Sequence, residues 1–308
     1  MVGPVWFDDI PVLGKLPPRQ AAAKLRELGE QELADAVISA DETESRAAAF
    51  GRLRDLFSPK AWAHTAHAFG FIPPARPEQD WLSVQHAGNI KADGELKSAR
   101  IKITLDRLRV ADYPGGGSHR ILFDFYAQNQ APGQIEHLHF NATYRARQGE
   151  EAAIIGYPIF VGLHVGAEGV AFKCYTVNVK NDHDEALLDF LDTDVFKGGL
   201  KLISTLQPAI APLSGMAVAL TKSIAERHRN VPVQEFYMGL DFEHPATRAR
   251  LAVGSYVAVQ IPQSQQRVWD WNDWGYHLAS GQLLSKDDRK QMIPYNYLVF
   301  GVSRYSGE

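Results

Sequence analysis

The segment Arg100-Ile101-Lys102-Ile103-Thr104-Leu105 decides the fold class of this chain, because apolar and polar side chains alternate along it. Successive side chains of an extended strand point to opposite faces, so Ile101, Ile103 and Leu105 share one face. The alternation therefore predicts a half-buried β-strand over residues 100–110.

Similar segments recur through the rest of the chain. Further strands are predicted over residues 121–126, 138–144, 154–163, 170–179, 233–242, 251–261, 268–276 and 295–305. Turn-rich pieces such as Tyr113-Pro114-Gly115-Gly116-Gly117-Ser118 separate them, and one helix is expected over residues 212–228. Many short strands with a single inserted helix indicate a mainly β protein, an antiparallel β-sandwich rather than a parallel α/β sheet.

The N-terminal part has helical periodicity instead. Apolar residues recur at helical spacing over residues 19–38, with a division expected at Gly29. Asp41 followed by Glu44 is a capping-box signature, in which each side chain satisfies a free backbone amide at a helix start. It predicts a second helix from that point.

A third helix is predicted over residues 60–69, ended by Gly70. The proline-rich connector at residues 72–77 is stiff and extended, and it marks a domain boundary. We therefore predict a helical N-terminal domain over residues 1–76 and a β-sandwich domain over residues 77–308.

Composition narrows the possible functions. The 308 residues carry a net charge of −4, with 45% hydrophobic and 22% charged residues, as in an ordinary globular protein. No nucleic-acid partner is expected, because phosphate binding requires a basic surplus; the densest basic segment, Arg227-His228-Arg229, is interpreted as a helix cap. Cys174 is the only cysteine, so no internal disulfide can form, and its apolar strand context predicts a buried thiol. A cytoplasmic location is expected.

The acidic run Asn181-Asp182-His183-Asp184-Glu185, with Asp189 shortly after it, follows the predicted strand at residues 170–179. Two interpretations are open. Carboxylates that converge from adjacent loops suit Ca²⁺, which takes 6–8 oxygen ligands. Alternatively, residues 185–191 form a short helix that Asp182 or Asp184 caps.

Parts of the β region resemble a C2 domain. Ile103-Thr104-Leu105 and Arg120-Ile121-Leu122-Phe123-Asp124-Phe125 are similar to the first strands of that family, and Phe140-Asn141-Ala142-Thr143-Tyr144 is similar to its Phe-Asn-x-Thr-Phe strand. Residues 177–189 resemble the strand and acidic loop that follow.

The resemblance implies a calcium site. Asp182, Asp184 and Asp189 stand where C2 domains keep calcium-binding aspartates, and Asp112 lies in the counterpart of the first loop. It also implies calcium-dependent recruitment to a membrane surface.

Two histidine pairs are further candidates for metal binding. His137 and His139 share one strand face, the geometry of a His-x-His metal pair, although the sequence identifies no third ligand. His64 and His67 lie one turn apart in the predicted third helix. The alternative for both pairs is a structural role, at the helix–sandwich interface in the case of His64 and His67.

The densest aromatic segment is Trp269-Asp270-Trp271-Asn272-Asp273-Trp274-Gly275-Tyr276. Three interpretations are open for Trp269, Trp271 and Trp274. They bury their rings beside a turn at Asn272-Asp273, or form a surface for a protein partner, or form a carbohydrate platform in which rings stack on sugars and carboxylates accept hydroxyl bonds.

No signature of a nucleophile elbow, phosphate loop or zinc protease is present in the sequence. We therefore expect a non-enzymatic binding or adaptor protein that docks a protein or membrane partner. One alternative is a metal-assisted hydrolase that uses Asp182, Asp184, His137 or His139. The other is a carbohydrate-binding sandwich. The sequence does not indicate an oligomeric state.

Overall fold

The computed structural model describes residues 6–42, 60–131, 134–152, 154–184, 188–189, 199–202, 210–243 and 249–307. The predicted helix over residues 19–38 is confirmed as two helices, α1 (Pro18–Glu27) and α2 (Gln31–Glu42), which divide at Gly29. Most of the helix predicted to open at Asp41 lies outside the described residues.

The third predicted helix is wrong. Residues 60–69 contain only the short 3₁₀ turn η2 (Ala61–Ala63), and the chain then enters the strand β1 (Ala66–Ile72). All seven residues of β1 pair with β11 (Gly254–Ile261). Both faces of β1 are covered, so its sequence is apolar on both sides and lacks the alternation that marks a half-buried strand.

The strands form three sheets, which confirms the mainly β prediction. In spatial order, the seven-stranded sheet contains β3 (Gln85–His86), β1, β11, β14 (Tyr297–Arg304), β4 (Arg100–Arg109), β7 (Tyr157–His164) and β9 (Leu200–Lys201). The four-stranded sheet contains β10 (Val231–Asp241), β8 (Gly169–Val179), β5 (Ser118–Ala131) and β6 (Gln134–Arg147). The three-stranded sheet contains β13 (Gln282–Ser285), β12 (Trp274–His277) and β2 (Trp81–Ser83).

Only one strand pair among the described residues is parallel, that of β7 with β9. The other pairs are antiparallel, as expected for a sandwich whose strands follow one another through short turns.

The main core lies between the seven-stranded and four-stranded sheets. Aromatic rings fill its centre, with Phe125, Phe172 and Phe300 in mutual contact at centroid distances of 5.4–6.4 Å. Such rings bury a large apolar area and hold the two layers together.

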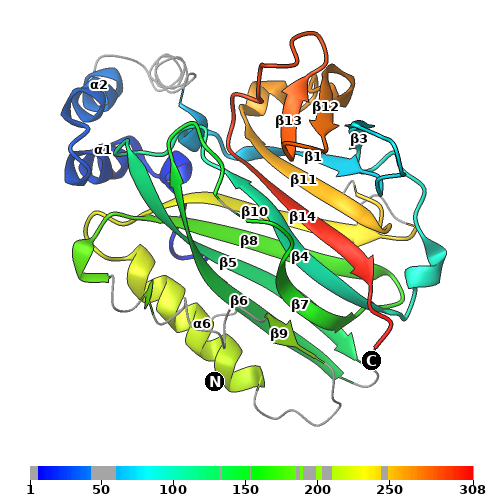
Figure 1. Ribbon diagram of the computed structural model, residues 1–308. Helices are drawn as coiled ribbons and strands as arrows, with labels where there is room; N and C mark the ends of the chain where they lie inside the picture. Colours follow the sequence, from blue (N-terminus) through cyan, green and yellow to red (C-terminus); the bar gives the residue numbers. More distant parts are fainter. Residues whose placement is uncertain are drawn as a thin grey trace.

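Further elements lie outside the two main sheets, among them α6 and the strands β12 and β13 (Figure 1), and each outer face has a smaller hydrophobic core of its own. The helix α6 (Ile210–Ala225), expected over residues 212–228, packs with the N-terminal residues 6–12 on the outside of the four-stranded sheet. The three-stranded sheet covers the outside of the seven-stranded sheet, where alternate residues of β1 contact it. Together, α6 and residues 6–12 cover the outer face of the four-stranded sheet, with α6 lying mainly against β6.

No helix in the described residues has the length and apolar character needed to span a bilayer.

Candidate functional site

The structure does not gather the four candidate aspartates into one metal site. Asp112 accepts a hydrogen bond from Gln148 at 2.9 Å. Within the described residues, no group of three or more His, Cys, Asp and Glu side chains could hold a metal ion. Calcium binding therefore stays a prediction that the fold does not support.

The acids of the loop after β8 are instead paired with arginines. Asp184, in the 3₁₀ turn η4 (Asp182–Asp184), is fully buried, forms an ion pair with Arg227, and accepts a hydrogen bond from Asn230 at 2.6 Å. Buried charges require such partners.

The other two acids of this loop are more exposed. Asp189 accepts a hydrogen bond from Arg120 at 2.6 Å, and Asp182 lies 3.9 Å from Arg229. Of the short helix predicted over residues 185–191, only residues 188 and 189 are described.

A pocket of about 250 Å³ opens beside these ion pairs. It lies where β5 begins and where β6 and β8 end, and it is closed on one side by the turn between α6 and β10. Its lining residues are Ser118, His119, Arg120, Arg145, Val179, Lys180, Asn181, Asp182, Leu188 and Arg229. We call it the basic pocket, because four lining side chains are cationic and one is acidic.

The glycine turn before β5 shapes this end of the sheet. Gly115, Gly116 and Gly117 have φ values of +85°, +50° and +71°, a left-handed conformation that only glycine adopts easily three times in succession. Lys180 donates to the carbonyl oxygens of Gly116 at 2.8 Å and Ser118 at 2.7 Å. An ammonium group has three N–H donors, so one donor of Lys180 remains for a ligand.

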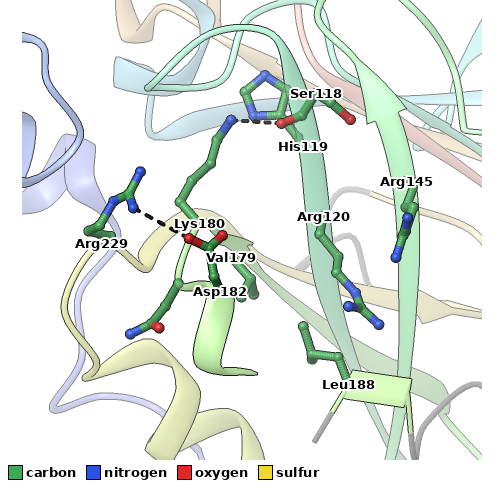
Figure 2. Close-up of a pocket in the computed structure, with 10 residues that line it drawn as sticks. Ser118, His119, Arg120, Arg145, Val179, Lys180, Asp182, Leu188 and Arg229 are labelled. Carbon is green, nitrogen blue, oxygen red and sulfur yellow. Dashed lines mark hydrogen bonds and ion pairs between the residues drawn. The ribbon is translucent and has the colours of Figure 1, made fainter. Parts of the chain in front are cut away.

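Two arginines face each other across neighbouring strands. Arg120 on β5 is directly opposite Arg145 on β6 in the register. Like charges in this position repel. Asp189 neutralises Arg120, whereas Arg145 has no ion-pair partner among the described residues. Figure 2 shows both guanidinium groups on one side of the basic pocket, with Lys180 and Arg229 on the other.

Burial, reinforced by neighbouring positive charge, shifts the pKa values of two pocket residues. Burial lowers the pKa of Lys180, and the nearby charge of Arg229 lowers it further. Burial, reinforced by the charge of Lys180, lowers the pKa of His119 to about 4. His119 is therefore neutral at pH 7, and an anion in the pocket would relieve the repulsion among the remaining cations.

The candidate histidine pair on β6 does not provide two free metal ligands. His139 is buried, and its Nδ1 lies 2.8 Å from a carboxylate oxygen of Asp124. The hydroxyl of Tyr126 lies 2.6 Å from Nδ1 of His137.

His64 and His67 are also buried, but His67 lies on β1 rather than on a helix. The ring of His67 packs on Phe69 and Phe236, and that of His64 on Tyr295. Both histidines thus pack against aromatic side chains.

The candidate tryptophans lie together on the other side of the sandwich. Trp271 is buried, and Trp269 and Trp274 are half-buried. The strand predicted over residues 268–276 is shorter than expected: β12 begins at Trp274, because the Asp270 side chain accepts a hydrogen bond from the Asn272 N–H and turns the chain into η7 (Trp271–Asp273).

Comparison with protein-family models, with curated proteins and with solved structures found no match. The C2 resemblance therefore stays a prediction.

Sequence analysis missed the basic pocket. Arg145, Lys180 and Arg229 come from three separate segments and form no basic cluster in the sequence. The available signal was local: Arg145 and Arg147 alternate at the end of a predicted strand, so both side chains project from one face.

Proposed function

We propose that the chain is a non-enzymatic binding module that docks a phosphate or carboxylate group of a protein partner in the basic pocket. The observation that carries this proposal is the charge of the lining: four cationic side chains surround one carboxylate, and Arg145 has no ion-pair partner among the described residues.

The chemistry of the cations suits an oxyanion. Arginine presents a planar fork of donors that matches carboxylate and phosphate oxygens in a bidentate manner, and lysine contributes a point charge. Arg145 and Lys180 lie on opposite sides of the basic pocket, so an anion between them would receive donors from two directions. The volume of about 250 Å³ suits a single anionic group rather than a large cofactor.

A protein partner fits the rim better than a lipid surface. One carboxylate, that of Asp182, lines the pocket, and a second, that of Asp189, is paired with the lining residue Arg120; the two side chains are 93% and 66% exposed. These acids would repel a continuous anionic bilayer, as would the net charge of −4. A single anionic side chain can enter between them.

The proposal is restricted to binding because the pocket histidine is poorly placed for proton transfer. His119 is 1% exposed, and its Nδ1 lies 3.2 Å from the side-chain oxygen of Asn178. Its low pKa also keeps it neutral, so it supplies a fixed polar wall rather than a general acid.

The test is calorimetric titration with a phosphoserine peptide, its unphosphorylated form and inorganic phosphate. Arg145→Gln removes one pocket cation, and Arg147→Gln removes the same charge from the same strand outside the pocket lining. A charge-assisted hydrogen bond contributes about 1.5–3 kcal/mol, so we expect roughly 10–100-fold weaker binding for Arg145→Gln and little change for the control.

Equal losses in the two variants, or no difference between the phosphorylated and unphosphorylated peptides together with no phosphate binding, would contradict the proposal. Vesicles that contain phosphatidylserine form a separate arm. Binding to vesicles that requires Arg145, without binding to the peptide, would replace the protein partner with a membrane.

A further inference from the structure

A second pocket, of about 340 Å³, lies between the loop around β3 and the turn η7. It shares no residue with the basic pocket. Its lining residues are Val84, Gln85, His86, Asn89, Trp269, Asp270, Trp271 and Asn272. We call it the aromatic pocket.

The polar groups of the aromatic pocket are mostly neutral. No lysine or arginine lines it, and its one carboxylate is that of Asp270. Because one carboxylate alone makes a poor cation site and the lining lacks a positive charge for an anion, an ionic ligand is disfavoured.

Three side-chain amides line the pocket and are available to a ligand. Within the described residues, the side chains of Gln85, Asn89 and Asn272 make no hydrogen bonds to the protein, and Gln85 and Asn89 are exposed. Each amide offers both a donor and an acceptor on a planar group. This combination matches a hydroxyl group, which also donates and accepts.

The aromatic wall is rigid. Trp269 contacts Trp271 at a centroid distance of 5.5 Å and 72°, and Trp274 at 5.9 Å and 6°. The Trp271 ring lies against Gly70 so closely that a Cβ there would approach its ring carbons to 2.9 Å. A wall held in this way requires little ordering when a ligand binds.

The indole nitrogens supply a further observation. The N–H groups of Trp269 and Trp271 are buried and have no acceptor among the described residues. Buried donors normally have a partner, and leaving one unpaired is costly. Because neither N–H group can be reached by a water molecule, both lie behind the pocket surface, and the lining amides and the Asp270 carboxylate carry the polar contacts to a ligand.

We propose that the aromatic pocket binds a neutral saccharide residue. The half-buried Trp269 ring packs on the apolar C–H face of a pyranose, with the buried Trp271 ring holding it in place, and the amides and the Asp270 carboxylate pair with the hydroxyl groups. The lack of a lysine or arginine in the lining disfavours acidic sugars. The volume lies within the range of small-ligand sites, about 300–1,000 Å³. This proposal is independent of the basic pocket.

The experiment is saturation-transfer NMR together with tryptophan fluorescence, with glucose, galactose, mannose, N-acetylglucosamine, maltose and cellobiose as the probes. Asn89→Ala and Trp269→Phe alter the pocket, whereas Trp81→Phe changes a half-buried tryptophan on β2 outside it. We expect saturable binding of at least one probe, a roughly tenfold loss in Asn89→Ala, and no loss in Trp81→Phe or Arg145→Gln.

Asn89 is exposed, so its truncation is expected to leave the fold intact and to report on binding alone. Thermal melting of each variant verifies this. No saturable binding of any probe to the unaltered chain would overturn the proposal, as would equal losses in Asn89→Ala and Trp81→Phe.

Discussion

Two polar regions share the outer face of the four-stranded sheet, and they differ in how fully their groups are paired. Under α6, the carboxylate of Asp124 is completely buried. It accepts hydrogen bonds from His139 Nδ1 at 2.8 Å, Asn141 Nδ2 at 3.1 Å and Thr221 Oγ1 at 3.0 Å. At the end of the same sheet, Arg145 reaches the basic pocket without an ion-pair partner in the described part of the chain.

This difference distinguishes side chains with a structural role from side chains that can bind a ligand. A buried group whose donors and acceptors are all supplied by the protein holds elements together, here α6 to β5 and β6. An accessible group with unused donors has capacity for a ligand. If this distinction holds, substitutions under α6 should reduce stability, and substitutions in the basic pocket should change anion binding.

The largest effect is expected at Asp124. Asp124→Ala removes the buried acceptor of His139 and Thr221 and one of the two acceptors of Asn141, so we expect a loss of about 3–5 kcal/mol in the free energy of unfolding. Urea denaturation measures it. Asp189→Ala, at a largely exposed carboxylate, is the control and should change stability by less than about 1 kcal/mol. A loss at Asp124 as small as that of the control would show that the network is not structural.

Buried groups without partners should make the fold sensitive to acid. Burial lowers the pKa of His67 to about 3, whereas the unfolded chain keeps about 6.5. Between these values the unfolded chain binds a proton that the folded chain excludes, so stability falls as the pH decreases below about 6.5. His67 alone should remove about 2 kcal/mol by pH 5.

Urea denaturation between pH 5 and 8 measures this slope. His67→Phe should reduce it by the contribution of one histidine, because the ring contacts with Phe69 and Phe236 are kept without a titrating group. The buried His64 and His119, whose pKa values burial lowers to about 4, account for a remaining slope. A substitution at the exposed His183 should leave the slope in place. An unchanged slope in His67→Phe would mean that the buried ring accepts its proton without cost.

The same distinction explains what could be predicted from the sequence. The strand β4 was predicted because one of its faces is buried and the other is half-exposed, so apolar and polar residues alternate over residues 100–105. β1 was mistaken for a helix because both of its faces are buried and its partner β11 lies far along the chain. The local periodicity of a sequence carries no information about a partner strand that lies far along the chain.

The partners of the acidic run could not be predicted for a related reason. The run left a cation site and a helix cap open as interpretations, because its counter-ions are not nearby in the sequence. Arg120 lies 69 residues from Asp189, and Arg227 lies 43 residues from Asp184. Folding brings these arginines to the acids and places Arg145 beside them. The net positive charge of the basic pocket therefore arises only in the tertiary structure.

A smaller effect is expected from the pH dependence of anion binding. Burial and Arg229 lower the pKa of Lys180, so its charge is lost at a lower pH than that of an ordinary lysine. The affinity for the phosphoserine peptide should therefore fall as the pH rises from 7 to 10. Lys180→Met should weaken binding at pH 7 by roughly tenfold, equivalent to about 1.4 kcal/mol.

Lys180→Arg keeps a charge over this whole range and should bind with little pH dependence. Lys201→Met, at an exposed lysine on β9, is the control for general electrostatics. A pH dependence that persists in Lys180→Arg would assign the titration to a different group.

The smallest effect, and the one of opposite sign, is expected at Asp189. Its carboxylate holds the guanidinium of Arg120 at 2.6 Å and so competes with an incoming anion for the same donors. Asp189→Asn should raise the affinity for the phosphoserine peptide by a fewfold and change stability by less than about 1 kcal/mol, since the carboxylate is largely exposed. Calorimetric titration beside Asp35→Asn, which removes an exposed carboxylate paired with Arg26 outside the pocket, separates this effect from net charge. A gain in both variants would reflect overall electrostatics, whereas a gain confined to Asp189→Asn would identify the acidic loop as an internal competitor of the ligand.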